Sequence, residues 1–270
     1  MLPDYLYHYT SIPTLALILH TKQIRLNRID KLDDLQESKS SDLGNHGRFY
    51  FVSCWSSPDI ESIPFWTMYT PKMAGVRIRL PADMFKKYTI QPQSDGFIHV
   101  PNEIESFLPY ERIVSDQYTV IPTIFKLESF LKQVEYTNDE AKIFPNVMRK
   151  GIHGITYSSE EFGKYKRLEW QFQNEWRFII KILPAPLNNK SLPQSQRLEH
   201  FERQLKSGLI SGSLPFDYFD MDLEPLIINS IEVVLGPRCT KGDEVVVDSL
   251  LSKYCTNSQL RHSNLKGLIR

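Results

Sequence analysis

A long aromatic and β-branched run in the second half of the chain constrains the fold more than any other feature. Residues 170–183 include the sequence Glu-Trp-Arg-Phe-Ile-Ile-Lys-Ile, which begins at Glu175. Tryptophan, phenylalanine and isoleucine are enriched in strands because their side chains pack well on a pleated, half-buried surface. We therefore predict that this segment forms a central strand of a β-sheet.

Several other segments have the pattern of strands, and fewer have the pattern of helices. The predicted strands cover residues 5–10, 23–27, 48–55, 75–80, 114–121, 134–136, 227–235 and 259–265, and helices are predicted after Ser11 and around residues 65–69, 196–205 and 241–254. Strands and helices do not alternate regularly, which argues against a doubly wound parallel sheet. The pattern predicts the α+β class instead.

The length of 270 residues, of which 41% are hydrophobic, suits one large domain with a substantial core. We expect a single domain over residues 1–270, in which residues 81–165 and 184–214 form insertions or a subdomain. The region 81–165 has the least regular pattern, so its role is not predicted.

Charge and cysteine content exclude several classes of protein. Lysine and arginine together number 32, as do aspartate and glutamate, which does not support attraction of the whole protein to nucleic acid or to an anionic membrane. Three cysteines without a Cys-x-x-Cys pair predict reduced thiols and no metal site. We expect no signal peptide and no membrane span, and hence a cytoplasmic protein.

Three common motifs of enzymes are missing from the sequence. It contains neither a Walker phosphate loop nor G-x-G-x-x-G, and it has no G-x-S-x-G nucleophile elbow. Their absence argues against the chemistry of P-loop proteins, of Rossmann dehydrogenases and of α/β-hydrolases.

His8 is the first candidate site residue. It lies at the end of a predicted strand and directly before a predicted helix, where side chains leave the core and meet ligands. A neutral imidazole can hydrogen-bond a ribose hydroxyl there, and Thr10 and Ser11 are neighbouring polar partners. The alternative is a structural histidine, or one that belongs to the helix cap.

Aromatic residues follow the predicted strand 48–55. Phe65, Trp66 and Tyr69 fall at helical spacing, and aromatic residues with that spacing usually belong to the core. A tyrosine ring at this place can alternatively stack on a flat heterocycle such as nicotinamide. Ser53, near the end of the strand, can donate a hydrogen bond to an amide of the same ligand.

Glu175 is the sharpest candidate for catalysis. A carboxylate at the start of a strongly apolar strand costs several kcal/mol if it is buried without a partner. It therefore lies at an exposed rim, pairs with Arg177 or Arg167, or serves a site. Lys164 and Lys166 add to a basic cluster that suits an anionic ligand, although surface lysines in solvent are the simpler interpretation.

The chain resembles a widespread bacterial family, domain-of-unknown-function family 2971. The resemblance lies in Leu-Tyr-His-Tyr-Thr-Ser at 6–11, Val-Ser-Cys-Trp-Ser at 52–56, Phe65-Trp66 with Tyr69 and Gly75, Trp170 with Glu-Trp-Arg at 175–177, and Val-Val-Leu-Gly-Pro at 233–237. These pieces occur in the family's order over almost the whole chain. The loop with Asp33, Asp34 and Glu37 is similar to the family's Asn-Asp-Pro-x-Glu stretch but lacks the asparagine and the proline.

The order of the same residues is also similar to that of the His-Tyr-Glu class of ADP-ribosyltransferases. In that class a histidine contacts the adenine ribose of NAD, a tyrosine stacks on nicotinamide, and a glutamate drives catalysis. The resemblance implies a mixed, mainly antiparallel split β-sheet with flanking helices and a catalytic role for Glu175. It implies that the following residues bind NAD: His8, Tyr9, Thr10, Ser53, Tyr69 and Arg177. Tyr9 departs from the pattern, because many members have a glycine there.

Cleavage of the nicotinamide–ribose bond passes through a transition state like an oxocarbenium ion. On this resemblance we expect an ADP-ribosyltransferase or NAD glycohydrolase that uses protein, nucleic acid or water as the acceptor, in bacterial stress response or phage defence. One alternative is a module that binds NAD, ADP-ribose or another nucleotide without turnover. Another is a protein-interaction module whose aromatic clusters belong only to the core. A nuclease or metal hydrolase lacks a recognisable ligand set.

Overall fold

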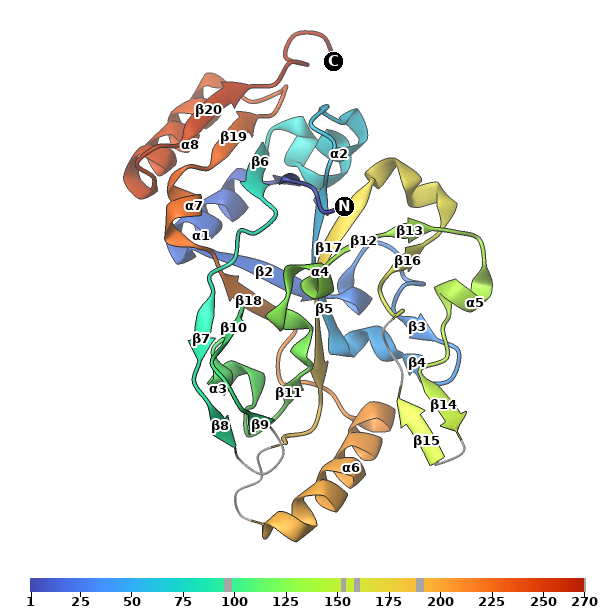
Figure 1. Cartoon of the computed structure of the whole chain (residues 1–270). Helices are drawn as coiled ribbons and strands as arrows, with labels where there is room; N and C mark the ends of the chain where they lie inside the picture. The colour runs from blue at the N-terminus through green and yellow to red at the C-terminus, as the bar shows by residue number, and fades with distance from the viewer. Residues whose placement is uncertain (95–98, 152–153, 158–160, 188–191, 270) are drawn as a thin grey trace.

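The computed structural model describes residues 1–94, 99–151, 154–157, 161–187 and 192–269. Within these residues ten strands form one sheet through the centre of the molecule (Figure 1). They are β1 (Tyr5–Thr10), β2 (Gln23–Arg28), β5 (Tyr50–Ser56), β6 (Val76–Pro81), β11 (Thr119–Val120), β12 (Leu131–Gln133), β17 (Glu175–Leu183), β18 (Tyr218–Asp222), β19 (Glu232–Leu235) and β20 (Gln259–His262). Of their pairings, only that of β19 with β20 is parallel. The predicted α+β class with a mainly antiparallel sheet is confirmed.

The predicted central strand is β17, which pairs along its length with β5, starting at Glu175 and Ser56. The strand begins at Glu175 because the preceding residues Leu168–Gln173 form a 3₁₀ helix, η5. Asn174 then takes a left-handed conformation, with φ 42°, that asparagine tolerates better than most residues. The chain turns at this asparagine, so Glu175 is fixed at the start of the strand.

The sheet divides at β5. One edge of β5 is paired with β17, whereas the other edge is shared between β1 and β2. On that edge β1 meets β5 at Ser56, and β2 meets it at Phe51 and Val52. Within the described part of the chain, residues 53–55 therefore face no strand on this edge. The division leaves an opening between β1 and β2.

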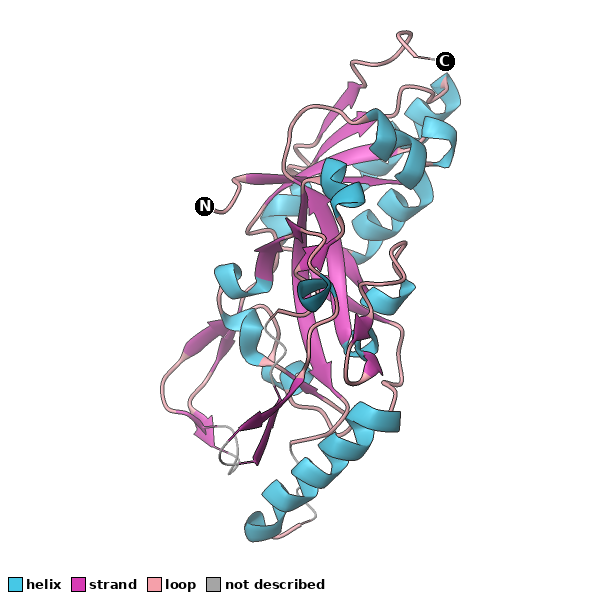
Figure 2. Cartoon of the chain, turned by 90° about the vertical axis from the view of Figure 1, so that its right-hand side faces the viewer, coloured by secondary structure: helices cyan, strands magenta, loops and turns pink. Residues whose placement is uncertain are grey.

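Helices flank the sheet, and α8 and α6 lie at opposite ends of the molecule in both views (Figures 1 and 2). The α-helices are α1 (Ile12–Thr21), α2 (Ile63–Tyr69), α3 (Tyr110–Ile113), α4 (Leu127–Phe130), α5 (Glu140–Ile143), α6 (Gln194–Ser211), α7 (Pro225–Asn229) and α8 (Lys241–Tyr254). The first helix begins as predicted, because the Ser11 hydroxyl accepts a hydrogen bond from the N–H of Thr14 at 3.1 Å. Pro13 lies in its first turn, where no backbone N–H is needed.

Short elements make up most of the remaining described residues. The two-stranded pairs are β3 (Lys39–Ser40) with β4 (Gly44–Asn45), β7 (Tyr88–Ile90) with β10 (Ile104–Ser106), β8 (Gln93–Ser94) with β9 (His99–Val100), β13 (Glu135–Tyr136) with β16 (Tyr165–Lys166), and β14 (Met148–Gly151) with β15 (Gly154–Tyr157). Further 3₁₀ helices are η1 (Ile29–Lys31), η2 (His46–Phe49), η3 (Pro71–Met73) and η4 (Pro122–Phe125). The region 81–165 holds most of these pairs and also supplies β11 and β12 to the main sheet.

Several predicted strands are shorter than expected, and β20, for example, ends at His262 instead of residue 265. Where a strand was predicted over 227–235, the chain forms α7 first and β19 only afterwards. Pro225 suits the first turn of a helix, and a short apolar run does not distinguish helix from strand. The strand predicted over 114–121 is reduced to β11, because the chain folds back on itself at a bridge between Val114 and Thr119.

One cluster of buried apolar side chains spans the sheet, from α1 and α8 to β17 and α6. It includes large aromatic residues on neighbouring strands, and Phe178 of β17 contacts Trp55 of β5 edge to face. Within the described ranges no helix combines the length and the apolar character that crossing a membrane requires.

Candidate functional site

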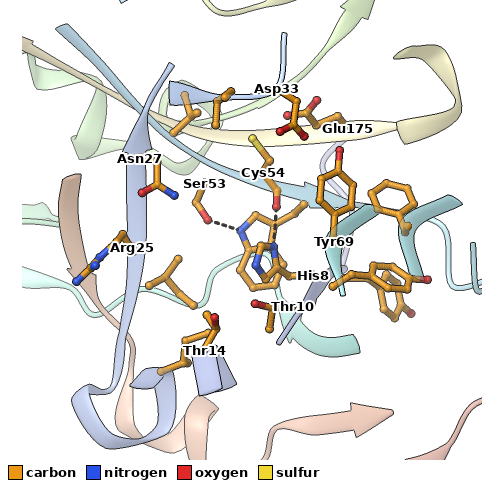
Figure 3. Close-up of a pocket in the computed structure, with 18 of the residues that line it drawn as sticks. His8, Thr10, Thr14, Arg25, Asn27, Asp33, Ser53, Cys54, Tyr69 and Glu175 are labelled. Atoms are coloured by element: carbon orange, nitrogen blue, oxygen red, sulfur yellow. Dashed lines mark hydrogen bonds between the residues drawn. The ribbon is translucent and has the colours of Figure 1, made fainter. Parts of the chain in front are cut away.

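A cavity of about 550 Å³ lies at the opening between β1 and β2 (Figure 3). Its walls come from β1, α1, β2, the loop after β2, β5, α2 and the chain around the start of β17. The volume lies within the range of about 300–1,000 Å³ that is usual for small-molecule sites. The predicted site residues that line the cavity are His8, Tyr9, Thr10, Ser53, Tyr69 and Glu175. Arg177 is not among the lining residues.

The His8 ring is held by the backbone of β5. Its Nδ1 donates a hydrogen bond to the carbonyl oxygen of Cys54 at 2.9 Å (Figure 3). Cys54 lies in the stretch of β5 that faces no strand on this edge, so the imidazole takes the place of a neighbouring strand. Because burial lowers the pKa of His8, its ring is neutral at pH 7. With the proton on Nδ1, Nε2 is left as an acceptor for a ligand hydroxyl.

The Ser53 hydroxyl lies on the cavity wall and donates to no residue that the structure describes. Its Oγ accepts a hydrogen bond from Nε1 of Trp55 at 2.9 Å (Figure 3). Both side chains are buried, which fixes the position of the hydroxyl oxygen. The hydroxyl proton can be donated to a ligand. Thr10 adds a second hydroxyl to the same cavity.

Tyr9 lines the cavity but also supports helix α2. Its ring stacks with that of Phe65, with the ring centres 5.0 Å apart, and its hydroxyl accepts a hydrogen bond from the N–H of Ser62 at 3.0 Å. Ser62 is the N-cap of α2. The ring that departs from the ADP-ribosyltransferase pattern thus fixes the start of the helix that carries Tyr69.

Tyr69 lies at the end of α2 and is connected to Lys166 through Gln173. The amide nitrogen Nε2 of Gln173 donates to the Tyr69 hydroxyl at 2.6 Å, and Oε1 of the same amide accepts from Nζ of Lys166 at 2.8 Å. Because an ammonium group only donates, Lys166 fixes the orientation of the amide. The Tyr69 oxygen is therefore an acceptor for Gln173, and its own proton is available to a ligand or a carboxylate.

Glu175 is 4% exposed and is held by two cations. Its Oε1 accepts from Nε of Arg177 at 2.6 Å, and its Oε2 accepts from Nη2 of Arg177 at 3.2 Å and from Nζ of Lys166 at 2.9 Å. The Cys54 side chain also contributes to the lowered pKa of the carboxylate. The predicted pairing of Glu175 with Arg177 is confirmed. The predictions that Glu175 lies at an exposed rim and that Lys166 is a solvated surface residue are wrong, because both side chains are buried.

A second carboxylate, that of Glu37, completes the cluster. It lies 3.2 Å from Nζ of Lys166 and also contacts the guanidinium of Arg177. Two carboxyl groups thus face two cations, and burial raises the pKa of Glu37 in spite of these positive charges. Burial alone raises the pKa of Glu175, but the charges of Arg177 and Lys166 outweigh this effect and lower the pKa to about 2. Glu175 is therefore ionised at neutral pH.

Arg177 positions this cluster and does not line the cavity. Its side chain is 0% exposed, and besides both carboxylates it donates to the carbonyl oxygen of Gly163 at 3.0 Å. The sequence-based prediction that Arg177 binds the cofactor directly is therefore replaced by a role in holding Glu175. The reason is the register of β17, in which residue 177 points to the same face as Glu175 but lies two residues deeper in the sheet.

Several residues of the cavity and the cluster were not predicted as site residues: Asp33, Glu37, Cys54, Lys166 and Gln173. Glu37 belongs to a loop rich in charged residues, in which no periodic pattern separates buried from exposed carboxylates. Lys166 and Gln173 are close to Glu175 in sequence, and this proximity is the one signal that pointed to them.

Away from Glu175, polar side chains of β2, β18 and α1 line the cavity. There Arg25 of β2 pairs with Asp220 of β18 at 3.0 Å, and both side chains are partly exposed. Thr14 and Thr21 of α1 also line the cavity. The cavity thus joins the buried, charged cluster around Glu175 to the ion pair between β2 and β18.

No group of three His, Cys, Asp or Glu side chains in the described residues is placed to hold a metal ion. The resemblances to domain-of-unknown-function family 2971 and to ADP-ribosyltransferases stay predictions from the sequence. Comparison with known proteins found no family model, no curated protein and no solved structure that matches the chain.

Proposed function

We propose that the chain is an ADP-ribosyltransferase-like enzyme that binds NAD in this cavity and breaks its nicotinamide–ribose bond. The ADP-ribose group is transferred to protein, nucleic acid or water. The proposal extends to the fold, because a mainly antiparallel sheet with a ligand site where it divides suits an ADP-ribosyltransferase-like architecture.

The observation that carries the proposal is the convergence of distant residues on one cavity. His8, Tyr69 and Glu175 were selected separately from the sequence, and Glu175 is 167 residues from His8. All three line the cavity, together with Ser53. Side chains that served only the core would not need to border a cavity of about 550 Å³. This arrangement supports a ligand site more strongly than any of the residues does alone.

Glu175 has the properties that the reaction requires. Positive charge develops on the ribose as the nicotinamide departs, and an ionised carboxylate that is fixed in place stabilises that charge. A carboxylate accepts about four hydrogen bonds, and here three come from Arg177 and Lys166. One acceptor position is left, and a ribose hydroxyl takes it when NAD binds.

His8 and Tyr69 hold the two ends of the dinucleotide in this proposal. The neutral His8 ring accepts a hydrogen bond from a hydroxyl of the adenine ribose through Nε2. The Tyr69 ring stacks on nicotinamide, and Gln173 fixes its hydroxyl. Holding both ends of the substrate lowers the barrier by positioning the bond that breaks.

The experiment measures nicotinamide release from NAD by the purified wild-type protein and by the Glu175→Gln and His8→Ala variants. We expect Glu175→Gln to reduce release by on the order of a hundredfold, which is about 3 kcal/mol. Glu169→Gln is the matched control, because Glu169 is exposed in η5 and lies outside the cavity lining. Circular dichroism and urea unfolding establish that each variant is folded. Absence of both release and NAD binding in the wild type overturns the proposal.

A second candidate function is a module that binds the nucleotide without cleaving it. The observation that favours it is that Arg177 and Lys166 donate three hydrogen bonds to Glu175, which hold the carboxylate in place without a ligand. Calorimetry separates the two candidates. Binding of NAD without nicotinamide release favours the module, whereas release that depends on Glu175 favours the enzyme.

A further inference from the structure

Three carboxylates line the cavity, and they differ in how they are paired. Glu175 is held by Arg177 and Lys166, and Asp220 is paired with Arg25. The carboxylate of Asp33 has no ion pair or hydrogen bond to any residue that the structure describes, and this residue is exposed. Among the described residues, Asp33 is therefore the cavity carboxylate that has no partner.

The loop after β2 holds Asp33 at the cavity through its neighbour. Asp34 is buried, and its Oδ1 accepts a hydrogen bond from the N–H of Gln36 at 2.9 Å, which closes a turn of the Asx type. Glu37, which follows Gln36, forms ion pairs with Lys166 and Arg177 of the buried cluster. The loop is thus fixed on one side by two buried carboxylates, and Asp33 is left on the side of the cavity.

Asp33 lies at the same end of the cavity as Glu175. Figure 3 shows both side chains above Cys54, with the Tyr69 hydroxyl beside them. The pKa of Tyr69 is raised first by burial and then by the negative charges of Asp33 and Glu175, so both carboxylates lie within electrostatic range of that hydroxyl. Asp33 and Glu175 therefore border the same part of the cavity, near the Tyr69 hydroxyl.

We propose that Asp33 is the general base that activates a hydroxyl acceptor, either water or an alcohol, for the transfer of ADP-ribose. This inference rests on the proposed cleavage of NAD. The C1′–N bond breaks, and its electron pair stays on the nicotinamide nitrogen, which makes nicotinamide neutral. The hydroxyl oxygen forms the new bond to C1′, and its proton passes to Asp33 and then to solvent.

The different pairing of the two carboxylates assigns their roles. Glu175 accepts three hydrogen bonds from two cations and is strongly held as an anion, so it stabilises positive charge and takes up no proton. Asp33 is unpaired and borders solvent, so it can accept a proton and release it to water. Hydroxyl acceptors need such a base because they attack while losing a proton.

The test compares nicotinamide release and products for the wild type, Asp33→Ala and Glu175→Gln, with and without sodium azide. We expect Asp33→Ala to reduce release by about 10²–10⁴-fold, the usual contribution of a general base. Azide is an anion that attacks without losing a proton, so it restores release by Asp33→Ala and yields ADP-ribosyl azide, seen by mass spectrometry. It does not restore Glu175→Gln. Asp248→Asn is the control, because Asp248 is exposed on α8 and outside the cavity lining.

The products also identify the source of the hydroxyl. Free ADP-ribose indicates water, and a methyl riboside formed in added methanol indicates that the site accepts alcohols. Wild-type release that Asp33→Ala does not reduce overturns the role of Asp33 and leaves the proposed function standing. A reduced rate that azide does not restore also overturns it. If the wild type releases no nicotinamide, both proposals fail together.

Discussion

The two ends of β17 bury polar groups in different ways. At its start, Glu175 faces Arg177 and Lys166, so opposite charges neutralise each other beside the cavity. Towards its other end, Lys181 lies against aromatic side chains, with its Nζ 3.8 Å from the centre of the Tyr157 ring. His46 is packed in the same place, and its Nε2 forms a hydrogen bond of 2.7 Å with the Tyr157 hydroxyl.

The difference shows how one strand supports both a candidate reactive site and an inert core. Ion pairs keep the Glu175 carboxylate charged although it is buried. At the far end, burial and the charge of Lys181 lower the pKa of His46 to about 3, so the imidazole is neutral. The charged end borders a cavity. The aromatic rings around His46 instead pack edge to face, and none of these residues lines that cavity. Variants that remove one partner at each end test this contrast.

The largest effect on stability is expected from Arg177→Met. It leaves Glu37 and Glu175 with Lys166 as the remaining cation, and the loss of one partner of a buried ion pair costs about 3–5 kcal/mol. Urea unfolding at pH 7 measures the free energy of unfolding, and Arg203→Met on the exposed face of α6 is the control. If Arg177→Met lowers the free energy of unfolding no more than Arg203→Met does, the cluster contributes no stability and the prediction is wrong.

A double variant sharpens the same prediction. Adding Glu37→Gln to Arg177→Met restores one carboxylate to one cation, so part of the loss, about 1–2 kcal/mol, is recovered. Glu37→Gln alone leaves two cations against Glu175 and destabilises the protein. Equal and additive losses for the two changes would contradict the description of these residues as one charge cluster.

A smaller, pH-dependent effect is expected at the other end of β17. The pKa of His46 is about 3 in the folded chain and near 6.5 when unfolded, so the unfolded state binds a proton first as the pH falls. The stability contributed by neutral His46 is complete above pH 6.5 and is lost as the pH falls towards 3, by about 2 kcal/mol at pH 5. Urea unfolding at pH 7 and pH 5 checks this, with His46→Phe as the comparison. The same pH dependence in both proteins would assign it to other groups.

The smallest effect is expected from Lys181→Met. The substitution keeps the apolar stem that packs in the core and removes the cation over the Tyr157 ring, which contributes about 1–2 kcal/mol when partly desolvated. The loss in urea unfolding should be well below that for Arg177→Met. A loss as large as that for Arg177→Met would erase the contrast between the two ends.

The sequence is sufficient to predict the elements that carry strong local patterns. The aromatic and β-branched run identifies β17, and Ser11 with Pro13 identifies the start of α1. Patterns failed where short apolar runs have no clear period, as at α7, which was predicted to be part of a strand. Local signals also sufficed to select Glu175 and His8, because a polar side chain at the start or end of an apolar strand needs a partner or a ligand.

The tertiary structure alone decided what surrounds those residues. Glu37 and Lys166 are 129 positions apart in the chain, and no local pattern indicates that both are buried against Glu175 and Arg177. The same holds for the carbonyl of Cys54, which accepts from His8 because the sheet divides beside it. Local sequence sets which backbone conformation a segment prefers. Pairing of strands and neutralisation of buried charge depend on groups far apart in sequence, and only the folded chain brings them together.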